Sequence, residues 1–361
     1  MAGATAVHDP EFNTTVKWDV ELLDGFSWTE IPNKGNGGPG FFGLLNPGLW
    51  GFIRKGQFDA VVCFTGYVRA SFWISFFACR LSRTAFLFGT DTFTVAAKDG
   101  RSWKPALKRF FWPYLYRLAD QTIVGSSPGR DLMLSLGIQP DHISVLPNAV
   151  DNDWWIDQAS RVDRDAVRAS WGATAETAVV LFCAKLQPWK RPGDLLRAFA
   201  EVNDPNSLLV IAGEGPLRQS MEEEAVRLGI ADLTRFLGFI NQSQLPSIYV
   251  GADLMVLPSE YDAFGLVVNE AYCCGCPAAV SDVVGAASDL VAPVDPALIF
   301  PHGDVSALAQ ILRSGLSHRQ RLQELRQAAF RRISNWSHRE SASATWEAIR
   351  SALQHRGQRD S

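Results

Sequence analysis

Short apolar runs alternate with helix-like segments in two successive stretches of the chain, residues 59–146 and residues 178–300. The runs predict buried strands at 60–64, 84–88, 121–124, 142–146, 178–184, 208–212, 234–237, 254–257, 277–280 and 297–300. Between them, the pattern predicts helices at 72–81, 105–118, 131–136, 194–202, 217–228, 245–250 and 270–274. Apolar strands separated by helices are typical of parallel sheets that are covered on both faces. The sequence therefore predicts an α/β protein with two doubly wound parallel sheets.

The segment from Pro147 to Asp151 separates the two stretches. We expect a first domain at residues 1–150, a second domain at 151–335, and a helical segment at 336–361 that packs back across the first. A chain of 361 residues has the natural length for two domains. Two such domains facing each other would enclose a cleft, and ligands of open α/β sheets bind at the carboxyl ends of the strands.

The first 58 residues do not show this alternation. Residues 33–43 contain five Gly and one Pro, which predicts a loop. Residues 41–53 are rich in aromatic and aliphatic side chains and are followed by Arg54 and Lys55. This pattern fits a membrane-surface patch and also fits an ordinary core helix.

Composition excludes several classes of protein. A net charge of −4 argues against a dedicated nucleic-acid binder. No apolar run has the length of a membrane span, and the N-terminus lacks the apolar region of a signal peptide. The six cysteines lack a second Cys/His pair at zinc-ligand spacing, so we expect buried free thiols, no metal site and a cytoplasmic location.

Two loops that follow predicted strands carry charged residues. In the first, Asp262 lies in a loop, Gly265 permits close backbone approach, and Glu270 lies inside the next helix. The N–H groups of Leu266 and Val267 at that helix start would face an anion, which suits a phosphate-bearing sugar. An ordinary strand-to-helix turn with solvated carboxylates is the alternative.

The second loop follows the strand predicted at 178–184 and carries Lys185 and Lys190. Two cations there, together with a helix N-terminus at Gly265, would hold one diphosphate. Solvated loop lysines are the alternative.

Four segments in register resemble the retaining, nucleotide-sugar-dependent glycosyltransferases of family 4, whose GT-B fold has two Rossmann-like domains. They are residues 184–192, 211–216, 236–239 and 262–271. The first half of the chain agrees more loosely, through residues 124–127, 136–138 and 148–151. The resemblance is therefore most specific for the predicted second domain.

The resemblance implies a role for individual residues. Lys190 matches the lysine on the donor diphosphate, and Glu270 matches the carboxylate that binds the donor ribose. Lys185 stands where the family usually has Arg, and Asp262 replaces the first Glu of the E-x7-E motif with a side chain one methylene shorter. The other implied donor contacts are Gly213, Phe239, Ile240, Phe264, Gly265, Leu266 and Val267.

The implied reaction transfers a hexosyl group from a nucleoside-diphosphate sugar to an acceptor hydroxyl with retention of anomeric configuration. Positioning and stabilisation of the departing diphosphate would supply the catalysis, without a metal or another cofactor. The implied acceptor is a saccharide or glycolipid of polysaccharide, lipopolysaccharide or glycolipid assembly, with possible peripheral contact to the inner face of a membrane. Asp151-Asn152-Asp153 resembles a D-x-D motif, but its place at the hinge indicates a structural role.

The chain departs from the family at two places. The family often has a His after the strand that matches residues 84–88, and Asp91 is the nearest polar candidate here, either as a sugar contact or as a simple helix cap or turn. The family also opens with a strand and a Gly-rich loop, and nothing before Asp59 fits that strand, since residues 16–23 are too polar. We therefore expect a first domain that lacks its beginning.

Other functions fit parts of this pattern. A non-catalytic nucleotide-sugar-binding protein is compatible with an incomplete first domain. A second enzyme function that fits is that of a GT-B epimerase or phosphorylase. A phosphorylase needs a pyridoxal cofactor, and the sequence has no Gly-rich loop for one.

Overall fold

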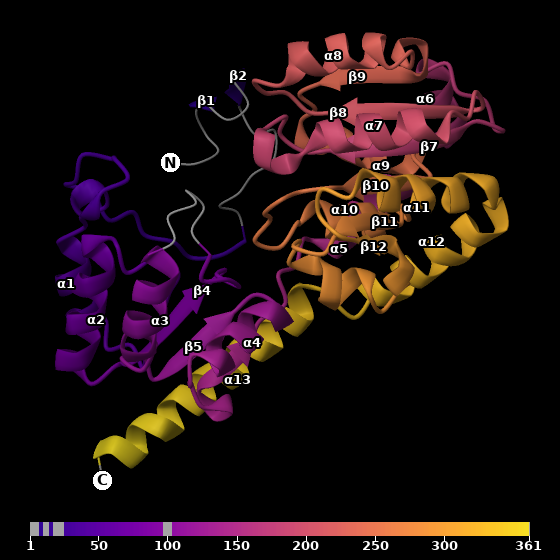
Figure 1. The fold of residues 1–361 in the computed structure, drawn as a ribbon. Helices are drawn as coiled ribbons and strands as arrows, with labels where there is room; N and C mark the ends of the chain where they lie inside the picture. Colours follow the sequence, from indigo (N-terminus) through magenta and orange to yellow (C-terminus); the bar gives the residue numbers. More distant parts are fainter. Residues whose placement is uncertain (1–6, 10–13, 17–24, 97–102, 361) are drawn as a thin grey trace. The chain divides into compact units, whose positions relative to one another are not determined.

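The computed structural model describes residues 7–9, 14–16, 25–96 and 103–360. Packing divides the chain into two units, which are described separately (Figure 1). The first unit is built from Gly25–Asn148 and the C-terminal segment from Arg339, and the second from Ala149–His338. Packing within a unit does not establish independent folding, so the domain boundaries at 150 and 335 stay predictions.

The sheet of the second unit has six parallel strands in the order β12-β11-β10-β7-β8-β9. This is the doubly wound order, and the direction of winding reverses between β7 and β10. The strands are β7 (Ala178–Cys183), β8 (Ser207–Ala212), β9 (Thr234–Gly238), β10 (Leu254–Leu257), β11 (Ala278–Ser281) and β12 (Ile299–Phe300). The strands predicted for residues 178–300 and the predicted fold class are confirmed.

Helices cover both faces of this sheet (Figure 1). They are α5 (Asn152–Ser160), α6 (Arg164–Ser170), α7 (Pro192–Val202), α8 (Arg218–Arg227), α9 (Leu245–Gly251), α10 (Val267–Cys273), α11 (Val305–Ser317) and α12 (Arg319–Ile333). In α7, Pro192 begins the helix, and Leu195, Leu196 and Phe199 form the buried stripe. The predicted helices are present with shifted ends, because caps and turns decide where a helix begins and ends.

The sheet of the first unit has four parallel strands that follow the chain order β3-β4-β5-β6. They are β3 (Ala60–Cys63), β4 (Ala85–Thr90), β5 (Gln121–Val124) and β6 (Ile143–Val145), and the helices between and before them are α1 (Gly48–Lys55), α2 (Ala70–Ser82), α3 (Trp103–Tyr116) and α4 (Ser127–Ser135). Within the described part of the chain, β3 pairs only with β4.

Two short strands before Asp59 were not predicted: β1 (Val7–Asp9) and β2 (Thr14–Val16) pair antiparallel in a ribbon of their own. Residues 17–24, to which most of the too-polar segment belongs, lie outside the described residues. The expectation that the first domain lacks its opening strand therefore stays a prediction.

The last helix, α13 (His338–Asp360), runs along the sheet of the first unit (Figure 1). Ala348 and Ala352 are fully buried in a cluster with Ala85, Leu87, Ile123 and Leu146. Small side chains let the helix backbone approach the sheet closely. The Arg356 guanidinium donates to the carbonyl oxygen of Thr84 at 2.6 Å, which ties the far end of the helix to the start of β4.

The segment from Phe41 to Lys55 combines both predicted characters. Ile53 of α1 is buried, as in a core helix. Phe42 and Phe52, however, remain exposed, as in a surface patch. No helix in the described chain is long and apolar enough to cross a membrane. The six cysteines are all buried free thiols, as predicted, and burial raises the pKa of Cys183 to about 12.

Candidate functional site

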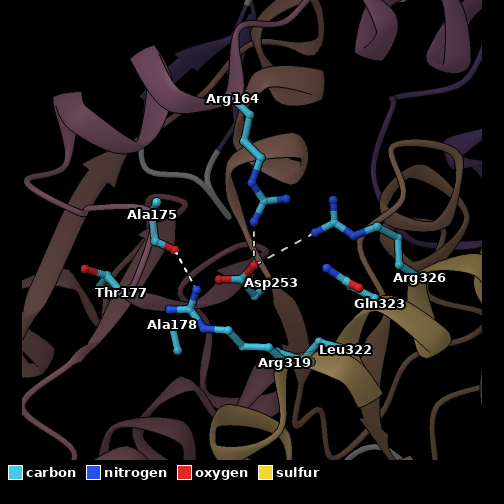
Figure 2. A pocket seen from close by; sticks show the side chains of 9 residues that line it. All are labelled: Arg164, Ala175, Thr177, Ala178, Asp253, Arg319, Leu322, Gln323 and Arg326. Carbon is cyan, nitrogen blue, oxygen red and sulfur yellow. Dashed lines mark hydrogen bonds and ion pairs between the residues drawn. The ribbon is translucent and has the colours of Figure 1, made fainter.

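A pocket of about 240 Å³ lies at the carboxyl ends of β7, β8 and β9 in the second unit. Six residues predicted from sequence line it: Lys185, Gly213, Phe239, Ile240, Val267 and Glu270. A larger pocket of about 370 Å³ opens at the opposite edge of the same sheet and contains none of the predicted residues (Figure 2). Position relative to the sheet, rather than size, therefore marks the smaller pocket as the candidate site.

Backbone hydrogen bonds between the loops shape the pocket wall. The N–H of Leu186 donates to the oxygen of Glu214, and the N–H of Gly213 donates to the oxygen of Gly238, both at 2.9 Å. A Cβ atom on Gly213 would lie 2.0 Å from the oxygen of Ala184. Only glycine therefore permits this approach of the loops after β7 and β8.

Glu270 lies in the first turn of α10, so the prediction that it lies inside a helix is confirmed. Its carboxylate Oε2 accepts a hydrogen bond from the Tyr249 hydroxyl at 2.7 Å. Burial raises the pKa of Glu270 to about 7, and the bond from Tyr249 opposes that rise. The pocket thus presents a half-buried carboxyl group that is held by one neighbour and titrates near neutral pH.

Lys190 and Asp262 form an ion pair, with Nζ to Oδ2 at 2.5 Å and exposed side-chain fractions of 18% and 14%. Lys190 ends the short 3₁₀ turn after β7, and Asp262 lies in the loop after β10, as predicted. These two loops flank the point where the sheet reverses its winding. Neither side chain lines the 240 Å³ pocket.

Gly265 adopts a φ of +93° between the Asp262 loop and α10. An added Cβ would lie 3.0 Å from Val284 and 3.1 Å from Leu257. The fold itself therefore requires glycine here, whatever ligand approaches the backbone.

The residues after the Asp262 loop face different surroundings. Phe264 is buried and stacks on Trp336, with ring centroids 6.0 Å apart and planes 7° apart. Its side chain belongs to the core. Leu266 is exposed, whereas Val267 lines the pocket. The donor contacts predicted for this segment stay predictions.

Asp91 follows β4 in the first unit and is exposed. No helix begins directly after it among the described residues, so it does not serve as a helix cap there. Asp151, by contrast, caps α5 by accepting from the N–H of Trp154 at 3.1 Å. The structural interpretation of Asp151-Asn152-Asp153 is confirmed for its first residue.

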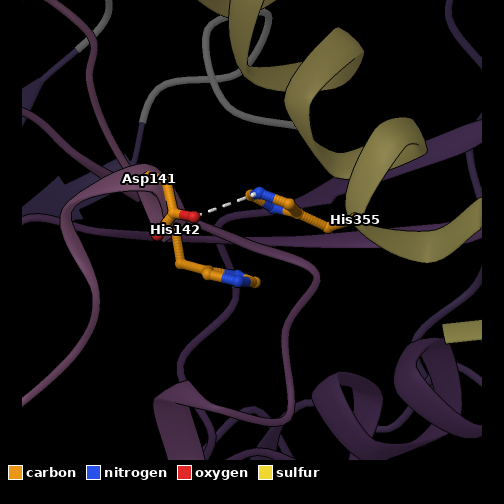
Figure 3. Close-up of side chains that lie close together, drawn as sticks. All are labelled: Asp141, His142 and His355. Atoms are coloured by element: carbon orange, nitrogen blue, oxygen red, sulfur yellow. Dashed lines mark ion pairs between the residues drawn. The ribbon is translucent and has the colours of Figure 1, made fainter. Parts of the chain in front are cut away.

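Asp141, His142 and His355 are a group of potential metal ligands in the first unit (Figure 3). The two imidazole rings stack, with centroids 3.9 Å apart and planes 20° apart. Each Nδ1 faces the carbonyl oxygen of Asp120, at 3.2 Å and 3.4 Å. The absence of a metal requirement stays a prediction.

Sequence reasoning missed Tyr249, Gln242 and Cys183. Gln242 and Cys183 line the pocket, and the Tyr249 hydroxyl lies 2.7 Å from Glu270 and 3.3 Å from the Cys183 sulfur. Tyr249 occurs in an apolar helix pattern that carries no signal for a polar contact. Only the structure shows that the buried Tyr249 hydroxyl donates a hydrogen bond to Glu270.

Comparisons with known proteins agree with this geometry. The family model described as Glycosyl transferases group 1 matches residues 163–332, and the model Glycosyltransferase Family 4 matches residues 16–154. The chain is 30% identical over 324 residues to a D-inositol 3-phosphate glycosyltransferase from Rhodococcus opacus, covering 87% of this chain and 68% of that protein. A similarly named protein from Catenulispora acidiphila is 35% identical over 182 residues, which is 47% of this chain. The chain spans only 42% of that relative and about half the length of several others.

Solved structures show the same fold at low sequence identity. Anabaena Alr3699/HepE in complex with UDP has a TM-score of 0.70 at 20% identity, covering 88% of this chain and 85% of that one. A glycosyltransferase from Rickettsia africae has a TM-score of 0.71 at 17% identity, covering 89% and 84%. Two parallel-sheet units, four motifs in register and these matches place the chain in the glycosyl transferases group 1 family, with the GT-B fold.

Proposed function

We propose that the chain is a retaining hexosyltransferase that moves a sugar from a nucleoside-diphosphate sugar to an acceptor hydroxyl. The observation that carries the proposal is the convergence of the Glu270 pocket and the Lys190–Asp262 pair at the reversal point of one sheet. Several solved neighbours are complexes with UDP or UDP-glucose, which supports a donor of this class.

Glu270 and the two lysines have complementary roles in this proposal. The Glu270 carboxylate accepts hydrogen bonds from the donor ribose hydroxyls, with Tyr249 holding it in place. Lys185 and Lys190 balance the charge that develops on the departing diphosphate. The bond from the sugar C1 to the phosphate oxygen breaks, the acceptor oxygen bonds to C1 on the same face, and its proton passes to the departing phosphate. No carboxylate nucleophile is needed, unlike in retaining glycosidases.

Asp262 would change partners when the donor binds. In the structure, its carboxylate is engaged by Lys190 at 2.5 Å. A diphosphate competes for the same ammonium group, which releases Asp262 toward the hydroxyls of the transferred sugar. Before the donor binds, the Asp262 carboxylate is therefore the ion-pair partner of Lys190.

Donor binding by purified protein tests the assignment. Titration calorimetry with UDP and a panel of other nucleoside diphosphates measures affinity for wild type, Lys190→Ala and Glu270→Gln. We expect each variant to weaken binding by at least tenfold. Arg313→Ala, an exposed position on α11, is the control and keeps wild-type affinity. If both site variants bind as wild type does, the site assignment fails. Donor binding without hydrolysis or transfer would favour the non-catalytic binder.

We also propose peripheral contact with an anionic membrane surface on the cytoplasmic side. A saccharide or glycolipid acceptor of polysaccharide, lipopolysaccharide or glycolipid assembly would lie there. The support comes from α3 rather than from residues 41–55. Its outer face carries a stripe of apolar side chains, 44 to 70% exposed, at helical spacing: Trp103, Leu107, Phe110, Phe111 and Tyr114. The same helix carries three cations, Lys104, Lys108 and Arg109, and no acidic residue. Such a helix suits the interface of an anionic bilayer.

Vesicle sedimentation tests the membrane proposal. Phe110→Ser with Tyr114→Ser should abolish binding to vesicles that contain anionic phospholipid, while the melting temperature stays unchanged because both side chains are exposed. Val226→Ser, an exposed apolar position on α8, is the matched control and should bind like wild type. Equal binding by the double variant would contradict a role for α3.

A further inference from the structure

The pocket of about 370 Å³ in the second unit is lined by arginines (Figure 2). Arg164 comes from α6, and Arg319 and Arg326 come from α12. Asp253 lies at its centre, immediately before β10, and Ala178 at its wall begins β7. The pocket therefore opens at the amino ends of parallel strands, at the other edge of the sheet from the Glu270 pocket.

The acidic groups of this region are already engaged. The Asp253 carboxylate accepts from Arg164, from Arg168 at 3.1 Å and from the N–H of Val179 at 2.8 Å. Arg319 pairs instead with Glu176 at 3.0 Å. Arg326 reaches Asp253 only at 3.9 Å. Four guanidinium groups thus share two carboxylates, which leaves an excess of two positive charges.

Arg164 and Arg326 share a single carboxylate oxygen, so the excess charge lies on these two groups. Both guanidinium groups point toward the same Asp253 oxygen, Oδ1, from different helices (Figure 2). Burial lowers the pKa of Arg326, and repulsion by Arg164 lowers it further. Within the described part of the chain, Arg164 has no hydrogen-bond partner besides Asp253, so most of its N–H groups remain available.

We infer that this pocket binds a small anion with at least two negative charges, of the phosphate or polyphosphate class, held by Arg164 and Arg326 beside Asp253. The planar guanidinium fork matches the geometry of phosphate oxygens, and the attraction of an anion to both groups would offset their mutual repulsion. Arg319 and Gln323 line the same pocket and supply further donors. Such a ligand links α6 and α12 to the sheet and therefore stabilises the second unit. The inference does not depend on the proposed transferase activity.

Pyrophosphate is the probe, and two variants remove pocket donors. Full-length protein is titrated with sodium pyrophosphate at constant ionic strength, and binding is followed by calorimetry and by melting temperature. We expect Arg326→Gln and Arg319→Gln to weaken binding by tenfold or more, and Arg326→Lys to weaken it less because the charge is kept. Arg313→Gln on α11 removes an exposed arginine outside the pocket and should change nothing. Melting temperatures without pyrophosphate show whether each variant folds.

The candidate donor site also attracts diphosphates, so the titration is repeated in Lys190→Ala. The inferred site keeps its affinity in that variant, whereas loss of all binding there would assign pyrophosphate to the donor site and overturn the inference. Equal binding by wild type and Arg326→Gln would also overturn it. So would the absence of any pyrophosphate binding, which would leave the arginines as structural ties between α6, α12 and Asp253.

Discussion

Asp262 and Glu270, the two carboxylates of the candidate site, lie only eight positions apart in sequence but have different surroundings. Asp262 is held by the Lys190 ammonium group at 2.5 Å. Glu270 is half-buried beside a phenol, which leaves desolvation as the main influence on its pKa. Environment rather than residue type thus pairs one carboxylate with a cation and raises the pKa of the other to about 7.

Glu270 should make stability depend on pH in a defined window. Its pKa is about 7 in the folded protein against 4.5 ordinarily, so the folded state binds the proton more tightly. Stability from this group is therefore fully present below about pH 4.5 and is lost as the pH rises to about 7. We expect Glu270→Gln to gain in melting temperature relative to wild type between pH 5 and pH 8. A difference between the two proteins that does not change with pH would contradict this.

Gly265→Ala should destabilise the second unit by about 2 kcal/mol or more, because left-handed strain adds to overpacking against Val284 and Leu257. Gly229→Ala is the matched control, since Gly229 has a φ of +70° but nothing within 4 Å of an added Cβ. It should lose only about 1 kcal/mol. Urea unfolding of both variants measures the difference, and equal losses would show that close packing at Gly265 contributes nothing.

At the scale of elements, helices α13 and α3 differ in which of their faces are buried and which are exposed. On α13, Ala348 and Ala352 lie fully buried against the sheet of the first unit. On α3, the face that carries Trp112 and Tyr116 is buried, and the opposite face exposes its aromatic stripe. Both helices were predicted from sequence, but the burial of their faces became evident only from the packing.

Enlarging a small residue on α13 tests that contact. Ala348→Leu should destabilise the first unit by about 1–3 kcal/mol, because Ala348 is fully buried against the sheet and a larger side chain would overpack that contact. Gln354→Leu places the same side chain at an exposed position of α13 and should be nearly neutral. Thermal unfolding measures both variants. A neutral Ala348→Leu would mean that α13 does not pack tightly on this sheet.

At the scale of the whole molecule, the two sheets differ in strand order. The second unit has the complete doubly wound order with its reversal between β7 and β10, and the candidate site lies at that reversal. The four described strands of the first unit follow one another without a reversal, and the C-terminal helix α13 adds to that unit's core. The last segment of the protein thus follows the second unit in the chain but packs in the first unit.

Ending the chain at Ser337 should therefore affect one unit only. The truncation uncovers the face of β4 and β5 that carries Leu87 and Ile123, so amide exchange should accelerate there and stay unchanged in β7 and β8. Ending the chain at Gln354 keeps the buried alanines and removes only the polar contacts of His355 and Arg356, so a smaller effect is expected. Hydrogen-exchange mass spectrometry resolves the two units. Equal acceleration in both units would contradict the assignment of α13.

The sequence by itself determined the positions of the strands and the loops that carry charge. Apolar runs and the residues that interrupt them are local signals, so β5 and β10 were predicted at their observed limits. The motif around Lys190 and the motif around Asp262 were also visible in the sequence. Tertiary structure alone decided that Lys190 pairs with Asp262, that Tyr249 holds Glu270 and that Arg164, Arg168 and Arg326 meet at Asp253. These contacts join residues far apart in the chain, and the order in which the strands pack decides which of them meet.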